Sequence, residues 1–136
     1  MEVFGLHHYL ICAPAELMEK CRAFYCDIIG LKAGARPKTA RTGYWLYTGD
    51  HPIVHLAIPK PGDAPISGRP PRGYLDHVAF ACRGLPATLD KLDRLQVPYR
   101  TSVVTDPPQV QIVVEDPAGT MIELNFRSES LPPGRA

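Results

Sequence analysis

The sequence predicts an α+β fold in which one structural unit occurs twice. A short apolar stretch with a central histidine stands near the start of the chain, in GLHHYLI, and again in YLDHVAF, with the two histidines 69 residues apart. Each stretch precedes a segment with helical spacing and then further extended segments. A polar residue also interrupts the last strand of each half, 47 residues after His8 as His55 and 46 residues after His77 as Glu123. This agreement to within one residue indicates a duplicated module.

In the first half, the spacing of apolar residues predicts a strand, a helix and two further strands. These elements fall at residues 3–12, 14–28, 43–47 and 53–58. Pro14 suits the first turn of a helix, and Gly30 ends the helical pattern. Tyr44, Trp45 and Tyr47 alternate in the second strand, where one face could line a pocket, although ordinary sheet packing explains them equally well.

The second half repeats this order after a segment that is too rich in proline and glycine for a helix or a central strand. Residues 59–73 contain five prolines and three glycines, which is typical of a linker. Strands are predicted at 75–81, 110–115 and 121–126, and a helix at 86–95. We therefore expect a single domain over residues 1–136, with module one at 3–58, the linker at 59–73, module two at 74–127 and a frayed tail at 128–136.

Composition excludes several classes of partner. The chain has 136 residues, with 15 Lys and Arg against 14 Asp and Glu, and this balance gives no support for nucleic acid as a partner. The stretch from Lys32 to Arg41 contains no acidic residue and is interpreted as a solvated loop. A weaker, second interpretation is that it binds an anionic substrate. No apolar run reaches the length of a membrane span. The four cysteines form no C-x-x-C pair, so we expect no thiolate zinc site and a reduced, cytoplasmic protein.

The four polar residues inside apolar strands form the candidate site. His8, His55, His77 and Glu123 occupy matching places in the two halves. A carboxylate in an apolar strand is costly unless it is paired or bound to a metal. Imidazoles and a carboxylate that converge suit one divalent metal ion, whose identity among Zn, Ni, Co, Fe and Mn stays open. Any one of the four could be a satisfied core residue, but duplication makes that explanation weaker for the set.

Two other histidines receive no role in this interpretation. His7 alternates with His8 and points to the opposite face of the predicted strand. His51 falls in the turn before the last strand of the first half, where we expect a loop residue that has a small chance of reaching a substrate.

The same stretches resemble the vicinal oxygen chelate superfamily, which includes glyoxalase I, methylmalonyl-CoA epimerase, fosfomycin resistance proteins and extradiol dioxygenases. The matching segments are LHHYLI, AFYCDIIGL, LDHVAF and EDPAGTMIELNF, and they extend over residues 3–126. The resemblance implies two βαβββ modules in one chain that form a cupped mixed sheet around a metal site. It also implies a small-molecule substrate and a homodimer, in which a metal site can take residues from two chains.

The metal ligands implied by the resemblance are His8, His77 and Glu123. The fourth family position, often Glu or Gln, falls on His55. His55 could be a fourth ligand, which would leave the site more positive than one with two glutamates, or it could be a general base. The catalytic candidates are therefore His55 and Glu123.

The resemblance does not decide among several reactions. The turn DPAG at 116–119 and Glu123 match part of the extradiol dioxygenase pattern, but Val113 stands where that pattern has a tyrosine. Leu10 stands where fosfomycin resistance proteins have a threonine. We therefore expect a metal-dependent, glyoxalase-like or epimerase-like lyase or isomerase that acts on a small substrate with neighbouring oxygens. The alternatives are a ring-cleaving dioxygenase and a metal-free, drug-binding resistance protein, a class that typically lacks ligands at these positions.

Overall fold

The structure, a computed structural model, describes residues 1, 6–37, 41–59, 77–106 and 108–135. The chain divides into two compact units, Met1–Pro70 and Pro71–Ala136. Each unit contains one helical segment and one four-stranded mixed sheet, and the two sheets have the same strand topology. The predicted α+β fold with two equivalent modules is confirmed.

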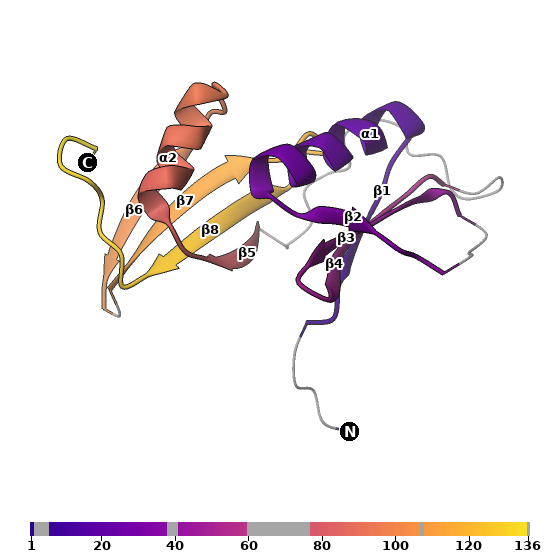
Figure 1. Ribbon diagram of the computed structural model, residues 1–136, viewed down its shortest axis with the longest axis horizontal. Helices are drawn as coiled ribbons and strands as arrows, with labels where there is room; N and C mark the ends of the chain where they lie inside the picture. Colours follow the sequence, from indigo (N-terminus) through magenta and orange to yellow (C-terminus); the bar gives the residue numbers. More distant parts are fainter. Residues whose placement is uncertain (2–5, 38–40, 60–76, 107, 136) are drawn as a thin grey trace. The chain divides into compact units, whose positions relative to one another are not determined.

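The first unit carries its helix before most of its sheet. Its elements are β1 (Tyr9–Cys12), α1 (Ala15–Ala23), the π-helical turn η1 (Phe24–Ile29), β2 (Lys32–Gly34), β3 (Gly43–Thr48) and β4 (His51–Ala57). The strand order is β1-β4-β3-β2. The first strand pairs with the last in parallel, and the remaining pairs are antiparallel. In Figure 1 the unit runs from indigo to magenta, with α1 along one face of its sheet.

The second unit repeats this arrangement. Its elements are β5 (His77–Cys82), α2 (Leu85–Arg94), β6 (Arg100–Thr105), β7 (Pro108–Glu115) and β8 (Met121–Arg127). The strand order is β5-β8-β7-β6, again with the first and last strands parallel. In Figure 1 this unit runs from red to yellow. Equivalent strands therefore occupy equivalent places in the two sheets.

Each sheet has an apolar face that packs in the core of its unit and a second face of more mixed character. The core of the first unit includes Met18, Cys21 and Tyr25 from the helical segment and Leu46, Val54 and Leu56 from the sheet. The core of the second includes Leu85, Leu89, Leu92, Val110, Ile112, Val114, Ile122, Leu124 and Phe126. Because side chains alternate along a strand, the residues between these core positions share the second face. His55 and Glu123 lie there.

Three local features differ from the sequence prediction. The resemblance implies a third strand after each helix, but the residue pattern did not place β2 and β6, since β2 has only three residues and β6 is largely exposed. The predicted helix over 14–28 is an α-helix only as far as Ala23 and continues as η1, which Gly30 ends at φ 91°. Over so few residues, the spacing of apolar side chains does not distinguish an α-helical from a π-helical segment.

The first strand is shorter than predicted. The prediction covered 3–12, but pairing begins with Tyr9 opposite Val54, and residues 6–8 have no strand assignment. Pro52 lacks the N–H that a ladder needs, and the pairing of β4 with β1 starts two residues after it. His8 therefore precedes β1 instead of lying within it. Residues 3–5 lie outside the described residues, as do 75 and 76 at the start of the predicted second-half strand.

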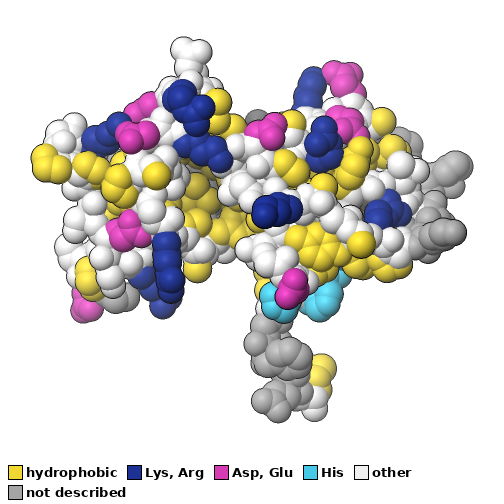
Figure 2. All heavy atoms as spheres, in the orientation of Figure 1, with side chains coloured by type: hydrophobic (Ala, Val, Ile, Leu, Met, Phe, Trp, Pro, Cys, Tyr) yellow, Lys and Arg dark blue, Asp and Glu magenta, His cyan; other side chains and the backbone are white. Residues whose placement is uncertain are grey.

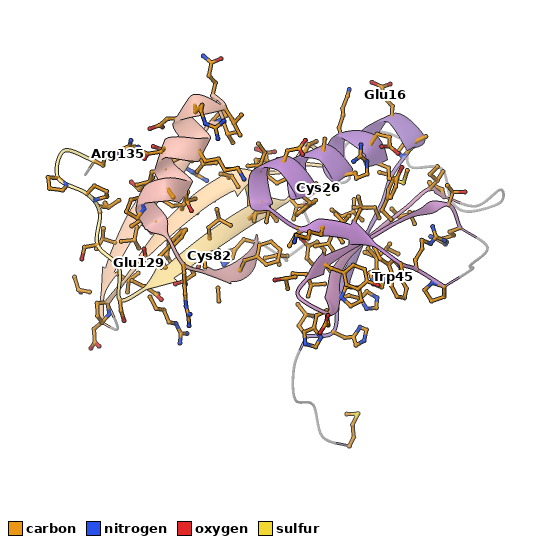
Figure 3. The ribbon with its side chains drawn as sticks, viewed as in Figure 1. Glu16, Cys26, Trp45, Cys82, Glu129 and Arg135 are labelled. Carbon is orange, nitrogen blue, oxygen red and sulfur yellow. The ribbon has the colours of Figure 1, made fainter. Side chains whose placement is uncertain are left out.

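The tail after β8 is attached to α2, not frayed as predicted. The Glu129 carboxylate accepts hydrogen bonds from the backbone N–H groups of Gly84 and Leu85, at 2.9 and 2.8 Å. Arg135 pairs with Asp90, at 2.8 Å, and with Asp93. Figure 3 labels Glu129 and Arg135, which lie along α2. The tail thus supplies acceptors to N–H groups at the helix start, which lack partners within the helix.

Two remaining predictions concern the linker and the membrane. Of the predicted linker, 59–73, only Pro59 belongs to the described residues. The basic stretch 32–41 begins with β2 and so is not a loop throughout. Among the helices that the structure describes, each is too short or too polar to span a bilayer.

Candidate functional site

The second face of the first sheet carries a stack of three rings. The imidazoles of His8 and His55 are nearly parallel, with centroids 3.9 Å apart and 16° between their planes. The Trp45 ring stacks on His55 at 4.2 Å and 7°. Trp45 and His55 are cross-strand partners on β3 and β4, so the sheet register itself places the two rings side by side. Figure 3 labels Trp45 on this sheet.

His55 is buried by this stack, and its surroundings favour the neutral ring. Its exposed fraction is 8%. Burial, followed by the proximity of His8, lowers the pKa of His55, while a hydrogen bond to the backbone of Pro52 opposes the shift. Its Nε2 is buried without a hydrogen-bond partner among the described residues. A buried polar atom of this kind usually has a partner, and an imidazole nitrogen is a good metal ligand.

His7 contacts His8 directly, which the alternation of side chains did not predict. The two Nδ1 atoms lie 2.7 Å apart, so one ring must donate the proton and the other must accept it. The reason is that these residues precede β1 and do not follow strand geometry. Figure 2 shows histidine side chains gathered together on the surface, and basic and acidic side chains interspersed over the face in view.

The second face of the second sheet carries an imidazole and a carboxylate. His77 Nε2 lies 3.5 Å from Glu123 Oε2, and the side chains are 43% and 11% exposed. His77 begins β5, whereas Glu123 lies in the middle of β8. The carboxylate is thus the buried member of the pair.

Two amide side chains hold the other oxygen of Glu123. Gln111 Nε2 donates to Glu123 Oε1 at 3.0 Å, and Asn125 Nδ2 donates to the same oxygen at 3.1 Å. The Ser102 hydroxyl donates to Gln111 Oε1 at 2.7 Å. A polar row therefore crosses β6, β7 and β8 on this face.

His55 and Glu123 occupy equivalent positions in the two ladders, and each pair has its other histidine at the same sequence distance from the residue opposite. In the first, Leu10 of β1 lies opposite His55, and His8 is two residues before Leu10. In the second, Ala79 of β5 lies opposite Glu123, and His77 is two residues before Ala79. His77 and Ala79 both belong to β5 and share a face of the sheet, whereas His8 precedes β1 and lies against His55 through its ring. The duplication predicted from sequence spacing is therefore also a duplication in space.

The structure brings the four predicted residues together as two pairs, one in each unit. Among the residues that the structure describes, no three His, Cys, Asp or Glu side chains form a metal-binding group. His51 is exposed at the start of β4, close to its predicted place in the preceding turn. The sequence reasoning missed Gln111, although it alternates with Val113, the direct partner of Glu123, and so shares its face.

The donor atoms of the two pairs suit a divalent transition metal. Both pairs offer imidazole nitrogens, and the second pair also offers a carboxylate oxygen, which are ligand types that such ions take. In the first unit the buried Nε2 of His55 has no partner among the described residues, and in the second unit the Oε2 of Glu123 accepts no hydrogen bond from either amide. The side chains present therefore fit the metal that the fold family implies.

Comparison with known proteins agrees with this architecture. The family model described as Glyoxalase/Bleomycin resistance protein/Dioxygenase superfamily matches residues 5–124. No curated protein matches the sequence. A Bacillus anthracis protein assigned to the glyoxalase family is 22% identical, with a TM-score of 0.71 over 94% of this chain and 98% of that one.

Two further solved structures share the fold. Lactoylglutathione lyase from Agrobacterium tumefaciens is 18% identical, with a TM-score of 0.60 over 92% of this chain and 95% of that one. TnmS3, an antibiotic-binding protein from Streptomyces sp. CB03234, is 20% identical, with a TM-score of 0.62 over 94% and 99%. At these identities the likeness concerns the fold. Because the family model covers most of its length and both sheets have the duplicated topology, the chain belongs to the Glyoxalase/Bleomycin resistance protein/Dioxygenase superfamily.

Proposed function

We propose that the protein is a metal-dependent lyase or isomerase of the glyoxalase or epimerase type. Its substrate is a small molecule with two neighbouring oxygens, such as a hydroxy-carbonyl compound. One divalent metal ion per site is held by His8, His77 and Glu123, with His55 as the fourth ligand or as a base. The observation that carries this proposal is that His55 and Glu123 hold equivalent ladder positions in two duplicated sheets, each next to a histidine.

The burial of one member of each pair supports a chemical role. His55 and Glu123 are 8% and 9% exposed, and burial of a polar group is costly without a compensating partner. Neither residue fills the apolar core of its unit, because both lie on the opposite face of their sheets. Two such residues at duplicated positions, each next to a histidine, are explained more simply by a ligand set than by independent structural roles.

The proposed chemistry is a proton transfer at a carbon next to a carbonyl. A divalent metal bound by these side chains would polarise two neighbouring substrate oxygens as a Lewis acid. Glu123 or the neutral His55 accepts the proton as the C–H bond breaks and returns it to the adjacent atom, so that no oxidant or reductant is consumed. His55 is suited to this role because its lowered pKa keeps the ring neutral. Trp45 covers one face of the ring and limits its contact with water.

A ring-cleaving dioxygenase is the second candidate. Two of the histidines and Glu123 could form the two-histidine, one-carboxylate set that non-haem iron oxygenases use. On β7, however, the residue directly opposite Glu123 is Val113. A valine cannot donate or accept a proton, so the group that the dioxygenase pattern places there is missing. This favours the lyase or isomerase.

A drug-binding protein without a metal is the third candidate. The three-ring stack of Trp45, His55 and His8 offers an aromatic surface, and TnmS3, which shares the fold, is an antibiotic-binding protein. A binding protein of this kind has no use for a buried carboxylate next to an imidazole. The His77–Glu123 pair therefore favours the enzyme.

We further propose a homodimer in the cytoplasm. The four cysteines, all among the described residues, form no disulfide bond, as expected in a reducing compartment. Light scattering of the purified protein measures the mass in solution, and a mass of two chains is the expected result. A monomer at all concentrations would refute the dimer and leave the proposed chemistry untouched.

Exchange of a substrate proton tests the proposed function. The protein is reconstituted separately with Zn, Ni, Co, Fe(II) and Mn and incubated in D₂O with 2-oxoaldehyde–thiol adducts and with chiral acyl thioesters. NMR should show metal-dependent deuterium incorporation or product formation, which Glu123→Gln abolishes. The matched control, Glu16→Gln on the exposed side of α1, should retain it. Metal-independent binding of aromatic antibiotics, without turnover of any substrate, would support the binding protein instead.

A further inference from the structure

We propose that Gln111 is a positioning residue for Glu123. Its amide holds one carboxylate oxygen so that only the other, Oε2, is presented on the side of His77. This inference rests on the proposed function in one respect, the role of Glu123 as a metal ligand. It concerns a residue on β7 that belongs to neither of the two pairs.

The hydrogen bonds of Glu123 are distributed unequally over its two oxygens. Oε1 accepts both amide N–H groups, from Gln111 at 3.0 Å and from Asn125 at 3.1 Å. Oε2 accepts neither and lies 3.5 Å from His77 Nε2. If the amides served only to satisfy a buried charge, one donor on each oxygen would do so equally well. Two donors on one oxygen fix the rotation of the carboxylate and leave the other oxygen for a further partner.

The Glu123 carboxylate, which can only accept, determines that the NH₂ end of the Gln111 amide faces it, so that the oxygen end faces Ser102. The Ser102 hydroxyl donates to Gln111 Oε1 at 2.7 Å, across the β6–β7 pair in which the two residues are direct partners. The amide thus turns its oxygen toward β6 and its NH₂ group toward β8. The reverse orientation would bring the Gln111 oxygen against the Glu123 carboxylate, and two acceptors repel each other. The row from Ser102 through Gln111 to Glu123 therefore has one favourable direction.

The pairing of β7 with β8 sets the distance between Gln111 and Glu123. Gln111 pairs with Asn125 and is the diagonal neighbour of Glu123 in the antiparallel β7–β8 ladder, a distance that long side chains span. Buried residues on both sides of Gln111, Val110 and Ile112, anchor β7 on the core face. A carboxylate held in this way binds a metal through one oxygen. A carboxylate without the restraint could bind through both.

Two isosteric substitutions on the same strand test this proposal. Gln111→Met keeps the length of the side chain and removes its amide. Gln109→Met is the matched control, since Gln109 is half-buried on the same face of β7, opposite Arg127 and away from Glu123. Mutation of a residue that hydrogen-bonds to a metal ligand typically lowers the metal affinity by about 10- to 100-fold. We expect a loss of this size for Co(II) in Gln111→Met and an unchanged affinity in Gln109→Met.

Two further measurements separate positioning from a structural role. The visible absorption of bound Co(II) should weaken in Gln111→Met, because a carboxylate that binds through both oxygens raises the coordination number, and should keep its intensity in Gln109→Met. Crystal structures of the metal-free variants should show Glu123 turned away from its place beside His77 only in Gln111→Met. A Glu123 side chain that keeps its place there would overturn the inference. A parent protein that binds no Co(II) would overturn the proposed function, while the metal-free structures would still decide the role of Gln111.

Discussion

The imidazole rings of His8 and His55 lie face to face, with their centroids 3.9 Å apart. Trp45 stacks at 4.2 Å on His55, and since two rings cannot occupy the same face, His55 is enclosed between His8 and Trp45. The first sheet thus fixes a buried imidazole by ring stacking, whereas the second fixes a buried carboxylate by amide hydrogen bonds. The duplicated register is the same, but the means of orienting the side chain differ.

Removal of the Trp45 ring should weaken metal binding. In Trp45→Leu one face of His55 loses its cover, so the imidazole is less restrained and more hydrated. We predict an affinity loss of about 10-fold, the lower end of the range for residues that orient ligands, measured by competition with a chromogenic chelator. Trp45→Phe, which keeps an aromatic ring in the same place, should lose much less. Equal affinities in all three proteins would show that the stack does not orient a ligand.

Catechols should not be cleaved by the Fe(II)-loaded protein. Val113 lies directly opposite Glu123 on the β7–β8 ladder and has no proton to exchange. With iron reconstituted without oxygen and the reaction started with air, we expect no oxygen uptake above the rate of iron alone. An oxygen electrode provides the measurement. A robust rate of ring cleavage would make the dioxygenase the leading function.

The contact between Glu19 and Tyr44 should be visible in a pH titration. A hydrogen bond from Arg22, followed by one from the Tyr44 hydroxyl, lowers the pKa of Glu19 below 4.5. A carboxyl whose pKa is lower in the folded than in the unfolded state stabilises the fold above about pH 4.5, and this contribution is lost as the pH falls through the lowered value.

Tyr44→Phe removes the second of these hydrogen bonds and should raise the pKa of Glu19 toward 4.5. Carbon NMR of the side-chain carboxyl measures it directly. Tyr47→Phe is the control on the same strand, because the Tyr47 hydroxyl donates to the backbone oxygen of Ala35 instead. If Glu19 titrates identically in Tyr44→Phe and in the parent, the hydrogen bond from the Tyr44 hydroxyl has no influence on the pKa of Glu19.

Glu129 should contribute measurably to the stability of the second unit. Its carboxylate accepts the Gly84 and Leu85 N–H groups at the start of α2, and this helix buries three leucines. Replacing a side chain that caps the start of a helix by alanine typically lowers the free energy of unfolding by about 1 kcal/mol. We expect Glu129→Ala to lower the free energy of unfolding in urea by about this amount, with Glu129→Gln in between. An unchanged midpoint in Glu129→Ala would contradict the cap.

The elements with long apolar patterns could be predicted from the sequence, and the short or exposed ones could not. The helices α1 and α2 and the strands β3, β4, β7 and β8 occur close to their expected places. The strands β2 and β6 were implied by the resemblance but could not be placed from the residue pattern, because nearly all of their side chains are exposed. The attachment of the tail to α2 could not be predicted, because Glu129 and Arg135 make polar contacts with residues about 45 positions earlier in the sequence.

The candidate residues could be chosen from the sequence, but the side chains around them could not. Counting from His8 and His77 selects His55 and Glu123, and the register of both sheets confirms the equivalence. Gln111 is a polar residue in an alternating strand, where such residues usually face water. Only the pairing of β7 with β8 places it next to Glu123. The contact of His7 with His8 could not be predicted because it depends on where β1 begins.

The chain contains a single tryptophan, and its contact with His55 provides the most direct test of the central proposal. Ni(II) or Co(II) bound by His55 should quench the fluorescence of Trp45, which stacks on that ring. We predict quenching that saturates at one metal ion per chain and is lost in Glu123→Gln, although Glu123 belongs to the other unit, because the proposed function has one ion bound by residues of both pairs. Quenching in Glu123→Gln with the affinity and stoichiometry of the parent would contradict this, since it would show a metal bound without the carboxylate.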